Sequence, residues 1–239
     1  MSPRAAGETG AAPFLARARG AGARRLAIWL CLVGLPLGYE ASALLRGPAT
    51  YYGGDHAYWF AGLDVHLVLT LVGLAAVGLG LWRSRRHPST IGWPSRLRWW
   101  EWVGGGALVL GALLLAAHNP GGVSGSNVAA SASTPATPLE RFTFAGVALL
   151  EAVGQELIWR GALITWLEPS LGTAGAALFA GASYVFFHPA FTFTWGELLT
   201  SVLVAAAYTT LFLWRRSIGP PALLHFLVVA GQLLVPIPT

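Results

Sequence analysis

Long apolar runs separated by short polar stretches dominate the hydrophobic pattern of this chain. A helix needs about 20 mostly apolar residues to cross a bilayer. Seven runs approach that length. The pattern therefore predicts an all-α, multi-spanning transmembrane helix bundle of about seven helices, which we place at 26–45, 61–82, 100–118, 140–164, 172–190, 197–214 and 219–236.

The polar stretches divide the sequence into four parts. Residues 1–23 are rich in Ala, Gly and Arg, which predicts a disordered basic tail. Residues 24–118 form a front three-helix membrane part. Residues 119–138 are rich in Gly, Ser, Thr and Pro, so we expect a flexible linker there. Residues 139–239 form a back four-helix part.

The composition supports a membrane location. Hydrophobic residues make up 55% of the chain and charged residues 10%, whereas soluble domains carry about 25% charged residues. A soluble globular protein is therefore excluded. The net charge is +5, and all fifteen basic residues are Arg. This bias, with abundant Ala and Gly, suggests a high-GC bacterial genome and an inner-membrane protein.

The distribution of Arg predicts the orientation in the membrane. Twelve Arg residues precede the first run or lie between the second and third or the sixth and seventh runs, all on one side of a seven-helix topology. Their place beside apolar runs indicates contact with the membrane surface rather than with nucleic acid. The positive-inside rule then puts the N-terminus in the cytoplasm and the C-terminus outside. A cleaved signal peptide ending at Ala41-Ser42-Ala43 is the alternative for the first run, against which the long region before it and Glu40 argue.

A group of Trp residues lies just before the third predicted helix. Trp93, Trp99, Trp100 and Trp102 are interspersed with Arg residues. Indole rings favour the membrane interface and Arg favours anionic headgroups, so we interpret this stretch as an aromatic belt. A site for a lipid substrate is the alternative.

Six polar residues stand out in the apolar runs of the back part: Glu151, Gln155, Glu156, Arg160, His188 and His225. A charged side chain at membrane depth costs about 2.5 kcal/mol or more, so Glu156 and Arg160, one helical turn apart, need a reason to be there. Glu151 and Gln155 are also one turn apart, on a neighbouring face of the same helix. Two adjacent polar faces predict that this helix borders a polar cavity.

Structural roles would account for each residue alone. Glu156 and Arg160 would form an ion pair within one helix. His188 would be a residue at a helix end, and His225 would make a hydrogen bond between helices. Together, however, they indicate hydrolysis, because a carboxylate and a neutral imidazole can deprotonate a water while a second imidazole donates to the oxyanion. We expect no cofactor. Zinc held by His188, His225 and Glu156 stays open, although the sequence has no His-Glu-x-x-His motif and Cys31 is its single cysteine.

The order and spacing of three short motifs connect these residues. They read Gln155-Glu156-Leu157-Ile158-Trp159-Arg160-Gly161, Tyr184-Val185-Phe186-Phe187-His188 and His225-Phe226-Leu227-Val228-Val229. This arrangement resembles the CPBP family of intramembrane endopeptidases, which includes CAAX prenyl endopeptidases and Abi-like bacteriocin-processing or immunity proteins. That family shows Glu-Glu-x-x-x-Arg-Gly, Phe-x-x-x-His and His-x-x-x-Asn on successive helices. The resemblance covers roughly residues 140–236.

Two positions depart from the family pattern. The resemblance implies a general base where this chain has Gln155, and a second oxyanion donor where it has Val229. Losing one oxyanion donor costs about 10²–10³ in rate, and losing the base costs about 10²–10⁴. Glu151, one turn before Gln155 on the same face, or Glu156 itself would have to supply the carboxylate.

The depth of the two imidazoles is a second difficulty. The predicted topology ends the fifth helix near His188 on the outer side and starts the seventh near His225 on the inner side. A shared site then requires helix tilt, a break near Pro189 or a re-entrant piece within 189–200.

We expect from this an intramembrane endopeptidase that hydrolyses a peptide bond of a membrane-associated protein or peptide, such as a C-terminal tail, a sorting signal or a leader. A carboxylate (Glu156 or Glu151) and His188 activate the water, and His225 stabilises the oxyanion. Arg160 positions Glu156, and Gln155 holds the water or the scissile amide. The partners are then a membrane-anchored substrate and the lipid bilayer.

Two other functions remain alternatives. A catalytically degenerate relative would bind a peptide or a membrane partner, in immunity or as a scaffold. A small transporter would also explain buried charges, but transporters are typically built from repeats and broken helices, and the sequence shows no internal repeat.

Overall fold

The computed structural model describes residues 21–46, 56–93, 104, 107, 138–187 and 195–231, and the regular elements in these ranges are all helices. The all-α prediction is confirmed for this part of the chain. The expected third helix at 100–118 lies outside the described residues apart from 104 and 107. Residues 1–20 of the expected tail, and the expected linker up to residue 137, also lie outside them.

The helices follow one another in a simple order. Residues 21–29 are helical and lead into a π-helical segment and then α2. The back part begins with α6, continues without interruption through a second π-helical segment into α7, and ends with α8 and α9. The labelled elements are η1 (Leu30–Gly34), α2 (Leu35–Arg46), α4 (His56–Ser84), η2 (Pro88–Ile91), α6 (Pro138–Glu156), η3 (Leu157–Ile164), α7 (Thr165–Phe187), α8 (Trp195–Arg215) and α9 (Gly219–Gly231).

Four of these helical stretches are long and apolar enough to span a membrane: Ala21–Tyr39, Leu67–Ser84, Ala145–Phe187 and Leu198–Arg215. A shorter apolar helix covers Gly219–Val229. The chain is thus an integral membrane protein, although the described residues alone do not establish seven spans. The expected helices at 140–164 and 172–190 are joined in one run, which changes direction at Gly172 (φ 68°, ψ 170°), a conformation open to glycine because it has no Cβ.

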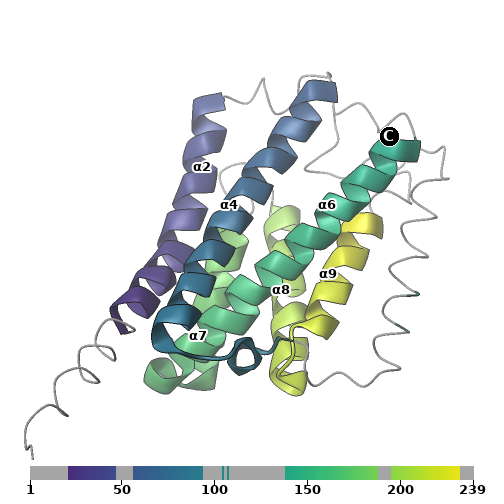
Figure 1. Cartoon of the computed structure of the whole chain (residues 1–239). Coiled ribbons are helices and arrows are strands. Elements are labelled where there is room, and N and C mark those ends of the chain that lie inside the picture. The colour runs from purple at the N-terminus through teal and green to yellow at the C-terminus, as the bar shows by residue number, and fades with distance from the viewer. Residues whose placement is uncertain are drawn as a thin grey trace, which may run out of the picture.

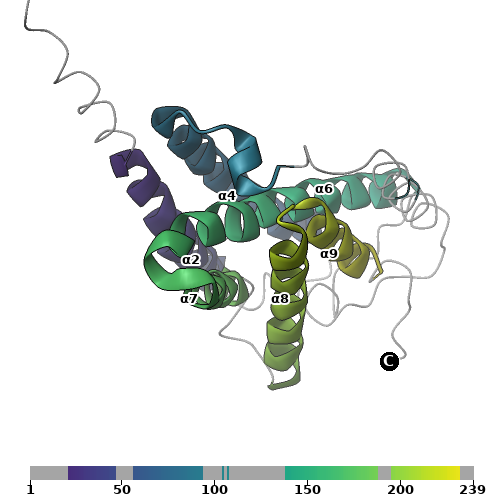
Figure 2. The ribbon, with the colours of Figure 1, turned by 90° about the horizontal axis from the view of Figure 1, so that it is seen from below.

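The bundle places α6 across its centre (Figure 1). The first helix and α4 lie on one side of α6, α9 lies on the other, and α7 and α8 lie behind, as the view from below also shows (Figures 1 and 2). α9 packs against both α6 and α8, and α7 packs against η3, α8 and α2. The first helix begins, α4 ends and α8 turns into α9 at the same end of the bundle (Figure 1). That end carries the clustered Arg residues of the described chain.

Two glycines bring other elements into close contact with α6 and η3. A Cβ on Gly154 would lie 2.5 Å from Cγ2 of Thr70 on α4, and a Cβ on Gly161 would lie 2.6 Å from the carbonyl oxygen of Ile91 on η2. Small residues at such positions let backbones approach closely, which is the usual means of helix packing in membranes. The front half of the chain therefore rests directly on the helix that carries the candidate site.

The turns at the basic end are fastened to one another. The amide of Ile218 donates to the carbonyl of Gly92 at 3.0 Å. Arg216 makes a two-pronged ion pair with Glu168 at 2.8 and 2.9 Å, and these hydrogen bonds raise the pKa of the Arg216 guanidinium. The bond links the part of α7 near its bend to the α8–α9 turn.

Candidate active site

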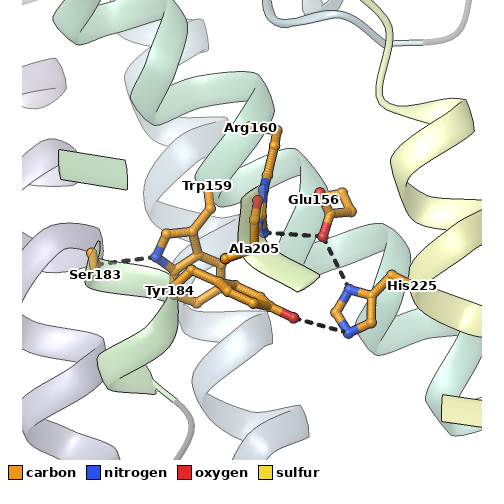
Figure 3. A network of polar contacts seen from close by, with 7 residues as sticks. All are labelled: Glu156, Trp159, Arg160, Ser183, Tyr184, Ala205 and His225. Atoms are coloured by element: carbon orange, nitrogen blue, oxygen red, sulfur yellow. Dashed lines mark hydrogen bonds and ion pairs between the residues drawn. The ribbon is translucent and has the colours of Figure 1, made fainter. Parts of the chain in front are cut away.

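The Glu156 carboxylate is the centre of a buried polar network (Figure 3). Its side chain is 0% exposed, and Oε1 accepts from Arg160 Nη1 at 3.1 Å and from His225 Nδ1 at 3.0 Å. Burying a lone charge in a membrane is costly, whereas a pair that is also hydrogen-bonded is tolerated. The predicted approach of Glu156 and Arg160 is present in the structure. The ion pair has a third partner, because the same Glu156 oxygen also faces Nδ1 of His225.

The position of Arg160 is fixed by three contacts with α7 and α8. Its Nη2 donates to the carbonyl of Ala205 on α8 at 3.2 Å. Its guanidinium carbon lies 4.0 Å from the centre of the Tyr184 ring and 5.2 Å from that of Tyr208. A desolvated guanidinium over an aromatic face gains about 2 kcal/mol. Arg160 therefore connects η3 to α7 and α8. Its bond to Glu156 also fixes the position of that carboxylate.

Both nitrogens of His225 have partners. Nδ1 faces Glu156, and Nε2 lies 3.3 Å from the hydroxyl of Tyr184. The imidazole is stacked on Tyr208 with ring centres 4.9 Å apart and an interplanar angle of 21°. These contacts bring α9 and α7 to one point within the bundle. The sequence suggested a difference in depth between His225 and His188, and His188 lies outside the described residues.

A second hydrogen-bonded link lies directly behind the network (Figure 3). Trp159 Nε1 donates to Ser183 Oγ at 3.1 Å, and the Ser183 hydroxyl lies 3.1 and 3.0 Å from the carbonyl oxygens of Cys31 and Leu32. These two carbonyls belong to η1 in the first helix. π-Helical segments are rare and occur often at functional sites. Here the π-helical segment η1 supplies two carbonyl acceptors to Ser183 of α7, the helix that follows the second π-helical segment, η3.

A different set of polar groups on the same helix lacks partners. Glu151 is 9% exposed and Gln155 is 3% exposed. Within the described residues, Oε1 of each, Oε2 of Glu156 and the Thr70 hydroxyl have no hydrogen-bonding protein group. Buried oxygens of this kind are almost always satisfied in folded proteins, by protein or by water. We interpret this face, where Thr70 packs at Gly154 between the two side chains, as a compartment suited to a water or a polar substrate group.

The structure thus unites three of the residues that the sequence singled out: Glu156, Arg160 and His225. Glu151 and Gln155 lie buried on the same helix, but the described contacts do not join them to the other three. His188 lies outside the described residues, directly after the end of α7 at Phe187. Val229 is part of α9 and offers no side-chain donor.

Four residues of the site were missed by the sequence reasoning: Trp159, Ser183, Tyr184 and Tyr208. Tyr184 had a signal, because it opens the second motif and carries a hydroxyl within an apolar run. Tyr208 and Ser183 had none, since a single hydroxyl in a membrane helix is compatible with many environments.

No group of three or more His, Cys, Asp or Glu side chains that could hold a metal ion occurs among the residues whose placement is described. The zinc alternative includes His188, which is not one of them. In the arrangement seen, His225 directs one nitrogen to a carboxylate and the other to a hydroxyl.

Comparison with known proteins gives one match. Residues 137–231 match the family model described as Type II CAAX prenyl endopeptidase Rce1-like. Neither the curated proteins nor the solved structures gave a match to the chain. The matched segment runs from the start of α6 to the end of α9, so it contains every side chain of the Glu156 network.

Proposed function

Residues 137–231 belong to the type II CAAX prenyl endopeptidase Rce1-like family, and on that premise we propose that the chain is an intramembrane endopeptidase. It hydrolyses a peptide bond of a membrane-associated protein or peptide with a water activated inside the bundle. The observation that carries the proposal is the Glu156 network: an ion pair and an imidazole, supplied by three helical stretches and held at one buried point.

The two carboxylates near this point are suited to different tasks. Glu156 is fully buried and one of its oxygens already accepts two hydrogen bonds. A carboxylate engaged in this way holds the Arg160 and His225 side chains in position. Each carboxylate has one buried oxygen without a protein donor, but Glu151 has no ion pair among the described residues and is slightly exposed. We therefore assign Glu151 as the general base and Glu156 as the group that positions Arg160 and His225.

The remaining roles follow from the chemistry of the side chains. Gln155 shares the Glu151 face and has a buried carbonyl oxygen without a protein donor, so it is placed to orient a water or the scissile amide. His188, which the family resemblance pairs with the base, is proposed to share the work of activating the water. The proposal requires no metal, because the water can be activated by a carboxylate and an imidazole alone.

The substrate class follows from the location of the site. Its residues lie in helices that cross the membrane, so the scissile bond must reach the interior of the bundle. A peptide that is itself anchored in the bilayer meets this condition most directly. Lipid-modified C-terminal tails, sorting tails and hydrophobic leaders are the forms that we propose to test.

A second candidate function is retained for a specific reason. The chain has Gln155 where the family resemblance implies a carboxylate, and Val229 where it implies an amide donor. If Glu151 does not replace the missing base, the same buried network becomes a recognition site that binds a membrane-anchored peptide without cleaving it.

The decisive experiment measures cleavage. The full chain, purified in lipid nanodiscs, would be incubated with a panel of lipid-anchored and transmembrane peptides, and products identified by mass spectrometry. We expect wild-type cleavage, and a loss of about 10²–10⁴ in rate for Glu151→Gln. The matched control is Glu168→Gln, which neutralises a carboxylate outside the network. Cleavage that is equal in wild type and Glu151→Gln would refute the base assignment. Binding of a panel peptide without cleavage by the wild type would favour the second function.

A chelator arm addresses the metal question in the same assay. Incubation with 1,10-phenanthroline followed by its removal should leave the rate unchanged if a carboxylate and an imidazole activate the water. Loss of activity that added zinc restores would show that a metal takes part.

A further inference from the structure

The hydrogen-bond partners of His225 fix the positions of its protons. Glu156 accepts from Arg160 through the same oxygen that faces His225 Nδ1. An ionised carboxylate can only accept hydrogen bonds, so Nδ1 must carry a proton. In a neutral imidazole the other nitrogen then bears a lone pair. Tyr184 lies 3.3 Å from that nitrogen, and with the imidazole taken as neutral its hydroxyl is the donor of this bond.

This tautomer prevents His225 from donating to a substrate. Its one proton is directed to Glu156, and its Nε2 accepts. Arg160 directs one N–H to Glu156 and another to the carbonyl of Ala205. Trp159 donates to Ser183, and α9 offers only Val229 one turn after His225. The O–H that remains at the reactive end of the imidazole belongs to Tyr184.

We propose that Tyr184 is a catalytic residue of this site: its hydroxyl is held by His225 Nε2 in the resting protein and turns to the carbonyl oxygen of a bound peptide as negative charge develops there. This inference rests on the proposed peptidase function. The bond to the carbonyl oxygen replaces the bond to Nε2, so no proton is lost or gained. His225 acts through Tyr184 by orienting the hydroxyl.

Two contacts and a buried position make Tyr184 suitable for this task. The Arg160 guanidinium over its ring draws electron density from the phenol, and this makes the O–H a stronger donor. The T-shaped contact of Trp159, at 5.7 Å, holds the ring in place. Tyr184 is also 4% exposed and lies one turn before the end of α7. A preorganised donor in a dry site contributes strongly because it needs little reorganisation during the reaction.

The chain provides a matched pair of variants. Tyr184→Phe keeps the ring and its contacts with Arg160 and Trp159 and removes only the hydroxyl. Tyr208→Phe removes a hydroxyl from the ring stacked on the same imidazole, and that hydroxyl has no hydrogen-bond partner among the described residues. A difference between the two variants therefore reports the bond to Nε2 and not the general loss of a phenol.

The first measurement is ¹⁵N NMR of histidine-labelled protein in detergent micelles, with His225 assigned by its loss in His225→Gln. We expect a neutral His225 protonated on Nδ1, and a hydrogen-bonded Nε2 whose resonance moves in Tyr184→Phe but not in Tyr208→Phe. A protonated Nε2 in the wild type, or the same Nε2 resonance in the wild type and Tyr184→Phe, would overturn the proposal.

The second measurement is turnover of a peptide that the wild type cleaves. Tyr184→Phe should lower kcat by about 10²–10³ while KM stays within about twofold, since a single oxyanion donor is lost. An unchanged kcat would exclude a catalytic role for the hydroxyl. If the wild type cleaves no peptide, it is the proposed function that fails, and the NMR comparison still decides whether Tyr184 and His225 are bonded.

Discussion

Two carboxylates on one continuous helix differ in almost every contact that they make. Glu156 shares an oxygen between Arg160 and His225 and is sealed from the surface. Oε1 of Glu151, just over one turn earlier, and Oε2 of Glu156 both lack a protein donor in the described structure. The two residues therefore differ in the two bonds that Glu156 Oε1 accepts. The comparison teaches that burial alone does not identify the reactive group. A carboxylate whose hydrogen bonds are made by protein contributes to architecture, and one whose bonds are left to water or substrate is available for chemistry.

The backbone conformation also differs around Glu151 and Glu156. Glu151 lies in the regular α-helical part of α6, whereas the chain becomes π-helical directly after Glu156. The wider turn changes which side chains face α7, α8 and α9 after this point. The two hydrogen-bond partners of Glu156 lie after this point in the chain, Arg160 in η3 and His225 in α9.

The largest expected effect is the loss of the paired carboxylate. Glu156→Gln leaves the Arg160 charge buried without compensation, and removing one partner of a buried pair costs about 3–5 kcal/mol. The free energy of unfolding in detergent micelles should fall by that amount. A loss under about 1 kcal/mol would show that the network contributes little to architecture.

Next in size is the effect of displacing the π-helical turn itself. Gly161→Ala puts a methyl group against the Ile91 carbonyl, which is backbone and cannot rotate away. Overpacking of this kind costs about 1–3 kcal/mol. Gly146→Ala is the matched control, because nothing lies within 4 Å of its added methyl group. Thermal unfolding should show Gly161→Ala below the wild type and Gly146→Ala equal to it or above it; the reverse order would contradict the packing of η2 on η3.

A smaller effect is expected at the exposed ion pair. Glu168→Gln breaks two hydrogen bonds to Arg216, but both side chains are partly exposed, at 27% and 44%. Surface pairs contribute about 0.2–1 kcal/mol. Unfolding measured at low and at high salt should show a small loss that salt abolishes. A loss as large as that of Glu156→Gln would mean that the bend of α7 depends on this bond.

The smallest effect on stability is expected for the unpaired carboxylate. Glu151→Gln removes a group that is costly to keep charged in its buried position and breaks no described hydrogen bond. The free energy of unfolding should stay unchanged or rise, although cleavage is lost. Exchange of stability for activity is common at functional sites. A destabilisation near that of Glu156→Gln would remove the distinction between the two carboxylates.

Much of this arrangement could be predicted from the sequence, because membranes penalise polar groups severely. The apolar runs predicted helices, and the turn spacing predicted the approach of Glu156 and Arg160. The positions of Glu151 and Gln155 on one buried face were also predictable from helical periodicity alone.

Other features depend on packing that one sequence does not display. The π-helical run Leu157–Ile164 has no signal in the period of its apolar residues, since every residue from Ile158 to Ile164 is buried. The helix boundary expected after residue 164 is instead a bend at Gly172. Tyr208 reaches the site from α8, where Arg160 also contacts the backbone carbonyl of Ala205, and no motif encodes these contacts.

The Ser183 hydroxyl has a consequence for how the protein can be divided. It accepts from Trp159 beside the site and donates its single proton to the backbone of the first helix. That helix lies entirely outside the segment that defines the family. An excised segment 137–231 would leave this hydroxyl without these two acceptors, so we expect a portion of the chain that preserves the Trp159–Ser183 link to include the first helix.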